Sequence, residues 1–215
     1  MSDHIRNLVM ITPPSEEPVS LATAKNHLRV TITNDDALIS ALITAARMLV
    51  EKECRRSLVQ RTYELRLDRF PWSASRMFPN LNQQCMPIGT WGIIEIPKPP
   101  LINVISITYQ DANGIVQTLD PSQYQVDTGG VLAGTVCPTY GVFWPTARVN
   151  IDSIKIQFNA GYGAASAVPA TATQAILLAI GNWYRNREDT TPENLKELPR
   201  GSRALISTLK WGSYR

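Results

Sequence analysis

The stretch that decides the fold is residues 33–68, TNDDALISALITAARMLVEKECRRSLVQRTYELRLD, because the spacing of its apolar residues changes part-way along. Up to Cys54 they recur at helical spacing, and Asp35 and Asp36 complement the positive end of a helix dipole. From Thr62 to Asp68 apolar and polar residues alternate, which is typical of a strand. The pattern therefore predicts a long helix that leads directly into a β region.

The helix predicted over 33–54 has a broad apolar stripe, which we expect to fill the interior of a helical bundle. The stripe consists of Leu38, Leu42, Ala45 and Leu49, with Ile39, Ile43, Ala46 and Val50 beside them. The charged residues are expected on the opposite side; they are Arg47, Glu51, Lys52, Arg55 and Arg56.

Three further helices are predicted outside this stretch. Ser20 is an N-cap for a helix over 21–29, and Pro169 opens a helix that runs to Arg187. Ser202 is expected to cap a short helix that ends at Leu209. Residues 1–19 contain three prolines and are predicted to form an extended arm.

The centre of the chain, residues 59–164, is predicted to be a β-rich insertion. Asp111-Ala112-Asn113-Gly114 is a hairpin signal, and 148–158 has the clearest alternation, with Val149 and Ile151 on the apolar side. Residues 73–92 are predicted to be a loop. The fold class is therefore α+β: a four-helix bundle from 20–58 and 165–215, with the β-rich insertion between its second and third helices.

Composition narrows the range of functions. Hydrophobic residues make up 44% of the chain, enough for a real core, whereas charged residues make up only 18%. A surface poor in charge favours self-association. The net charge of +3 is too small to indicate nucleic-acid binding, although 185–215 is locally basic, with seven basic and four acidic residues.

The cysteines and the N-terminus indicate where the chain is made. Cys54, Cys85 and Cys137 are dispersed and odd in number, which argues against a disulfide framework or a zinc site. The apolar run near the N-terminus is too short for a signal peptide, and no stretch has the length of a membrane span. We expect a chain made in a reducing cytoplasm, with no membrane partner.

The sequence contains no catalytic signature that would indicate an enzyme. Gly161-Tyr162-Gly163 lacks the third glycine of a dinucleotide fingerprint, and His27 has no second histidine near it. Asp35 and Asp36 are explained by their place at a helix start, and Glu188-Asp189 by a solvated face. We predict no catalytic residue, no metal and no cofactor, and hence a structural or assembly role.

A family resemblance enters through residues 19–30, VSLATAKNHLRV, followed by DDALI at 35–39 and AARMLVE at 45–51. This order resembles the head-tail connector, or adaptor, proteins of long-tailed phages, in which S-L-x-x-A-K-x-H-L-R-V leads into D-D-x-L-I and A-A-R-x-x-V-E. FNAGYG at 158–163 and LPRG at 198–201 also fall in the expected order. Thr23 departs from the pattern, since an acidic residue is common there.

The resemblance implies a structural virion protein rather than an enzyme. Connectors of this kind form a dodecameric ring in the neck of the virion, between the capsid portal and the tail or a stopper protein. Double-stranded DNA passes through the ring without specific binding, and assembly takes place in the cytoplasm of the bacterial host. Longer members carry a β module, as this chain is predicted to do.

Two sets of site residues follow from the resemblance. Arg47, Glu51 and Arg55 are expected at the contact between ring subunits. The portal-docking residues are expected in a C-terminal segment that orders on its partner, and they are Leu205, Leu209, Lys210, Trp211, Tyr214 and Arg215. Alternatively, Leu205 and Leu209 complete the helical bundle.

A second functional class stays open at this point. The chain also fits a β-module protein with helical flanks that binds a carbohydrate or another surface ligand. Such a protein would carry a cluster of exposed aromatic side chains on its sheet.

Overall fold

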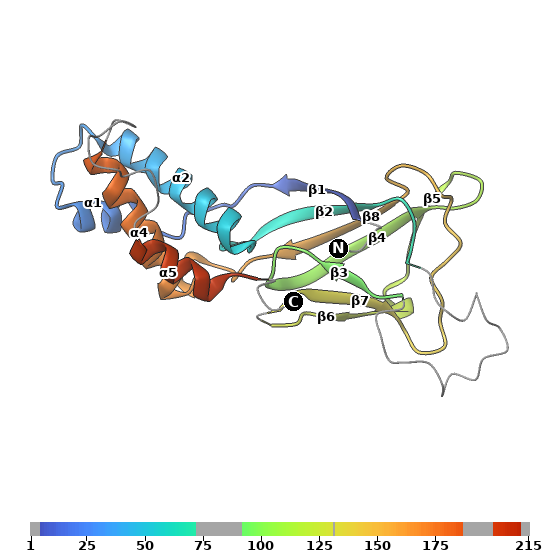
Figure 1. Cartoon of the computed structure of the whole chain (residues 1–215). Coiled ribbons are helices and arrows are strands. Elements are labelled where there is room, and N and C mark those ends of the chain that lie inside the picture. The colour runs from blue at the N-terminus through green and yellow to red at the C-terminus, as the bar shows by residue number, and fades with distance from the viewer. Residues whose placement is uncertain (1–4, 72–91, 131, 187–199, 212–215) are drawn as a thin grey trace. The chain divides into compact units, whose positions relative to one another are not determined.

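The computed structural model describes residues 5–71, 92–130, 132–186 and 200–211. The chain divides into two compact units, each built from two separate stretches (Figure 1). Met1–Pro13 and Arg61–Ala160 form one, which we call the β unit, and Pro14–Gln60 and Gly161–Arg215 form the other, the helical unit. The predicted mixture of helices and strands in an α+β fold is confirmed.

The helical unit has four helices in the part of the chain that is described. They are α1 (Leu21–Leu28), α2 (Asp36–Cys54), α4 (Ala170–Arg185) and α5 (Arg200–Leu209). Together they enclose one apolar core, whose fully buried members include Ile39, Ile43 and Val50 of α2 and Ile176 and Ile180 of α4. Each helix is amphipathic and buries one face there.

Local sequence explains where the first helix begins and how closely it packs. The Ser20 hydroxyl accepts a hydrogen bond from the Thr23 backbone N–H at 3.1 Å, so Ser20 is the N-cap of α1 as predicted. A Cβ on Gly181 of α4 would lie 3.4 Å from His27 Nε2, so this glycine leaves room for the α1 histidine. Ser202 was expected to be a cap, but it is buried inside α5, which already begins at Arg200.

The β unit contains two antiparallel sheets (Figure 1). The larger has the order β1-β2-β8-β4-β5, with bounds Ile5–Thr12, Arg61–Leu67, Ile154–Ala160, Leu101–Gln110 and Val116–Thr118. The smaller has the order β3-β7-β6, with bounds Ile94–Ile96, Gly134–Pro138 and Tyr124–Asp127. Asp111 to Gly114 form the turn between β4 and β5, as the Asn-Gly pair predicts.

The two sheets share a single core. Leu65, Ile107 and Ile156 of the larger sheet are fully buried together with Ile96 and Val136 of the smaller one. The sheets approach closely at Gly134, where an added Cβ would lie 2.3 Å from Leu101 Cδ2. A larger residue there would force Leu101 to shift, so glycine suits the close approach of the two layers.

Two β predictions are refined by the structure. Residues 5–12, predicted as part of an extended arm, are extended and pair with β2 as the edge strand β1. The strand expected from residue 148 begins only at Ile154, because Asp152 has a left-handed backbone and the Ser153 hydroxyl donates to the Arg148 carbonyl. Val149 and Ile151 are consequently 74% and 60% exposed instead of buried.

The loop predicted over 73–92 lies outside the described residues, except for Gly92. In the described residues, no helix combines the length and apolar character needed to cross a membrane.

Candidate assembly surfaces

A buried ion-pair cluster holds the start of the helical unit against α2. Arg47 Nε and Nη2 donate to the two carboxylate oxygens of Glu17 at 2.6 and 3.2 Å, and Arg47 Nη1 donates to Glu51 at 3.0 Å. The Leu58 backbone N–H donates to the other Glu51 oxygen at 3.0 Å. The cluster therefore ties three segments together: residues 14–19, α2 and the chain that follows α2.

The burial of the cluster corrects the prediction that its charged residues lie on the side of α2 opposite the core. Arg47 and Glu51 are 5% and 6% exposed, so they do not lie on a solvent side of α2, and Arg56 is equally buried. Burial alone would lower the pKa of Arg47, but the hydrogen bond to Glu17 and the charge of Glu51 outweigh it and raise the pKa. Their predicted part in the contact between subunits stays a prediction.

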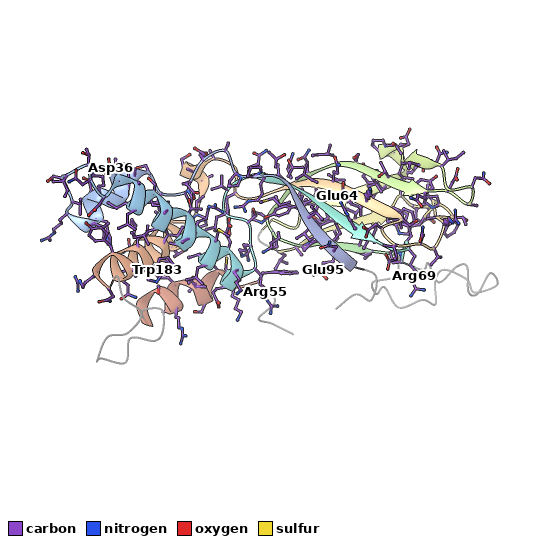
Figure 2. All side chains as sticks on the ribbon, turned by 90° about the horizontal axis from the view of Figure 1, so that it is seen from above. Asp36, Arg55, Glu64, Arg69, Glu95 and Trp183 are labelled. Atoms are coloured by element: carbon purple, nitrogen blue, oxygen red, sulfur yellow. The ribbon has the colours of Figure 1, made fainter. Side chains whose placement is uncertain are left out.

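The exposed side of α2 carries different residues. Met48 is 60% exposed and Leu38 is 39% exposed, and Ala41, Ala45 and Lys52 lie with them at helical spacing. Arg55, the third predicted ring residue, is the exposed residue just past the C-terminal end of this stripe (Figure 2). The sequence does indicate this second apolar face, because the apolar residues of α2 extend over two sides of the helix, which is more than one core requires. Leu38 and Ala45 were nevertheless predicted to lie in the interior of the bundle.

The C-terminal helix is part of the helical core. Ile206 is 5% exposed, and Leu205 and Leu209 pack partly buried against the core. Buried Arg56 donates to the Leu209 carbonyl, and the Trp211 N–H donates to the Cys54 carbonyl at 3.0 Å, which fixes the end of α5 to the end of α2.

These contacts correct the expectation that the segment orders only on its partner, because residues 200–211 already pack within the subunit. Among the predicted docking residues, Lys210 is exposed and Trp211 is half-buried. Tyr214 and Arg215 lie outside the described residues, and the docking role of the whole set stays a prediction.

A groove of about 610 Å³ runs beside Glu17 in the helical unit. Its lining includes Ser20, Ser40 and Thr44, which offer hydroxyl groups, and the carboxylates of Glu16 and Glu17. Glu17 is held by Arg47, and Glu16 accepts the Ala165 N–H at 2.7 Å. Both acids therefore serve to hold the chain together.

Exposed aliphatic side chains gather where the hairpin turn meets the loop before β8. The hairpin contributes Ile115 and Val116, exposed by 58% and 65%, and the loop contributes Val149 and Ile151. A backbone hydrogen bond from the Arg148 N–H to the Gln110 carbonyl, 2.9 Å long, joins the two segments. Such a grouping is typical of a protein-contact surface.

The outer face of the larger sheet is polar. Arg66 Nε donates to Glu64 at 2.8 Å and its Nη1 to Asp152 at 3.2 Å, while Gln157 donates to Glu64 at 3.2 Å (Figure 2 labels Glu64). Burial alone would raise the pKa of Glu64, but the hydrogen bonds from Gln157 and Arg66 outweigh it and lower the pKa.

The aromatic cluster that a carbohydrate-binding module would carry is not on the described part of the sheet. Phe70 stacks on Trp144 at 4.8 Å and meets Tyr109 edge-on, so these rings are used in the core. Tyr140 and Phe143 are exposed, but both lie in the loop between β7 and β8. Likewise, no group of three or more His, Cys, Asp or Glu side chains in the described residues is placed to hold a metal ion.

Comparison with known protein families identifies the family of this chain. Residues 18–124 match the family model described as "Phage gp6-like head-tail connector protein". The chain belongs to this family of head-tail connectors. No curated protein matches the connector.

Solved structures share the connector's whole fold. The connector is similar, at 20% sequence identity and a TM-score of 0.72, to a chain from the neck of an empty gene transfer agent particle with C6 symmetry. A chain from the virion of the native particle has 22% sequence identity and a TM-score of 0.71. A chain from the native neck with C12 symmetry has 20% identity and a TM-score of 0.68. In all three cases the match covers 96% of both chains.

Proposed function

We propose that this connector forms a closed ring in the virion neck, between the capsid portal and the tail or a stopper protein. The observation that carries the proposal is the similarity over 96% of both chains to proteins of particle necks, two of them described with C6 or C12 symmetry. Family membership supports the same role independently. The ring lies in the assembled virion, and its subunits are made in the cytoplasm of the host.

The helical unit is the proposed connector domain, a four-helix bundle into which the β unit is inserted. Support comes from the single core that α1, α2, α4 and α5 share, although 100 residues of the β unit separate α2 from α4 in sequence. A shared core gives each ring subunit a rigid body with fixed surfaces. Rigid surfaces keep the rotation between neighbours constant, and a heterologous contact closes into a ring when that rotation divides the full circle evenly.

The contact between subunits is proposed to include the exposed stripe of α2, from Leu38 through Met48 to Arg55. The stripe is apolar over most of its length and basic at its C-terminal end. Ala41 and Ala45 let a neighbouring backbone approach closely, and Met48 adapts its shape to the surface that it meets. Arg47 and Glu51 contribute to this contact by holding α2 in position.

Portal docking is assigned to the end of α5 and the residues beyond it. Lys210 is exposed and Trp211 half-buried, so both are accessible to a partner without unfolding of the subunit. Tryptophan, tyrosine and arginine are the residue types that contribute most to binding energy at interfaces.

DNA is proposed to pass through the ring without specific binding. The net charge of +3 per subunit is small, and residues 101–184 contain just two basic residues. A weakly charged channel holds few phosphates, so the DNA can move.

The experiment mixes the full-length connector with its purified portal protein and measures particle size by light scattering and negative-stain imaging. We expect a ring on one end of the portal with the portal's rotational symmetry, or a symmetry related to it. The matched control is the portal with a connector shortened to residues 1–211, which keeps α5 in the helical core and removes only the residues beyond it. Portal particles of unchanged size and shape with the full-length connector would refute the proposed function.

A further inference from the structure

Among the residues that the structure describes, the two outer edges of the larger sheet are open and chemically similar, although they belong to different strands. In the described part of the chain, no strand pairs with the outer side of β1. On the other side of the sheet, β5 pairs with β4 only at Thr108–Gln110, and no other strand of the described ranges pairs with that side of β4 from Leu101 to Ser106.

Both open edges present aliphatic side chains at points where the strand register shifts. Ile11 lies at a register shift of β1 and is 47% exposed, and Met10 beside it is 50% exposed. Ile102 and Ile105 lie at the two register shifts of β4 and are 37% and 48% exposed. The extra residue at each shift directs an isoleucine outward, away from the sandwich core.

These edges carry little of the charge that normally protects a free edge strand, since Arg6 is the one charged residue in β1 and β4. β4 has no charged residue among its ten, and none of the β1 residues from Asn7 to Thr12 is charged. Free edges in soluble proteins are usually blocked by charged residues or proline, because open backbone groups attract other strands. An edge that is aliphatic and uncharged is therefore expected to be covered in the assembled state.

Strand direction determines what fits between the two edges. β1, β2, β8 and β4 alternate in direction, since each neighbouring pair is antiparallel, so β1 and β4 run in opposite directions. Rotation about a ring axis preserves the direction of every strand relative to that axis. If the β1 edge of one subunit faces the β4 edge of the next, the alternation continues unbroken around the ring.

We propose that the occupant of each edge is a second copy of this chain: Ile11 and Met10 on β1 of one subunit pack against Ile102 and Ile105 on β4 of its neighbour. This inference rests on the proposed ring and names a contact that closes it. The contact is heterologous, because two different edges meet, and a heterologous contact is the kind that builds a cyclic ring. It is a contact of side chains from both edges, and it covers the open backbone groups beneath them.

Cysteine cross-linking tests the pairing of unlike edges. In a Cys85→Ser, Cys137→Ser background, we would prepare Ile11→Cys, Ile105→Cys and the double variant, each assembled on the portal and treated with a short bismaleimide. The double variant is expected to give a ladder of covalent oligomers on a denaturing gel, and each single variant only monomer. A dimer from either single variant would mean that like edges meet and would overturn the proposal.

The outcomes separate this contact from the proposed function. Rings on the portal in which the double variant stays monomeric would overturn the edge contact alone. Absence of any ring, with the wild-type chain as well, would overturn the proposed function and the edge contact with it.

A charge variant provides an independent measurement. Ile11→Lys places a charge in the proposed contact and is expected to raise the protein concentration needed for half-maximal ring assembly by about tenfold or more. Leu132→Lys is the matched control, since Leu132 is a 69% exposed aliphatic residue of the same unit that lies between β6 and β7, on neither edge. Equal assembly by Ile11→Lys and Leu132→Lys, with both variants folded by circular dichroism, would contradict the proposal.

Discussion

Replacement of Arg47 by methionine tests whether the buried cluster stabilises the helical unit. Methionine keeps most of the length and apolar volume of arginine, so the change removes the charge without opening a large cavity. Glu17 and Glu51 then lose their cation. The Glu51 side chain is 8% exposed and cannot be hydrated in place, whereas the Glu17 side chain is 30% exposed and can turn to solvent.

The expected loss of stability follows from these exposures. Removal of one partner from a buried ion pair costs about 3–5 kcal/mol. Because Glu17 can be hydrated and Glu51 keeps its hydrogen bond from the Leu58 N–H, we expect a value near the lower end, about 3 kcal/mol. For a chain of this size the loss corresponds to a fall in melting temperature of roughly 6–12 °C.

The assay is thermal and urea unfolding followed by far-UV circular dichroism, with Arg55→Met as the matched control. Arg55 is exposed one residue past the end of the same helix, and its replacement should change stability by less than about 0.5 kcal/mol. Addition of Glu51→Gln to Arg47→Met should recover part of the loss, because the amide is neutral and its oxygen still accepts from Leu58.

The result that would refute this reasoning is an Arg47→Met variant as stable as Arg55→Met that fails to assemble into rings. That combination would mean that Arg47 acts at the contact between subunits, as the sequence first predicted. A large loss of stability in the free subunit supports the internal role.

Three further outcomes are expected. The hydrogen bonds that lower the pKa of Glu64 stabilise the folded state fully above the unfolded pKa of about 4.3, and this stabilisation is lost as the pH falls through the lower pKa of the folded state. Glu64→Gln should therefore flatten the decline of melting temperature below about pH 4.5. Gly134→Ala should lower the free energy of unfolding in urea by about 1–3 kcal/mol, because its Cβ would collide with Leu101. The control Gly201→Ala, whose Cβ would meet nothing closer than 3.7 Å, should be neutral or stabilising. Equal effects of the two changes would contradict the close approach of the sheets. Deletion of 212–215 should leave the melting temperature unchanged and weaken portal binding in a pull-down at least about tenfold, and undiminished binding would remove Tyr214 and Arg215 from the docking surface.

Local sequence alone determined the positions of most elements. Ser20 caps α1 wherever the helix packs, because the bond to the Thr23 N–H involves residues only three apart. The Asn113-Gly114 pair forms its turn for a similar reason, since Gly114 has the positive φ that the turn requires. The order of the connector motifs also needs no structure, and it led to the family that residues 18–124 match.

Tertiary structure decided which face each element buries and what the edge strands pair with. The apolar pattern of α2 fits two faces, and only packing against α4 selects Ile39, Ile43 and Val50 for the core and leaves Met48 exposed. Arg47 is buried because Glu17, 30 residues earlier, supplies a carboxylate there. Such choices depend on contacts between residues far apart in the chain, and the spacing of residues within one element carries no information about them.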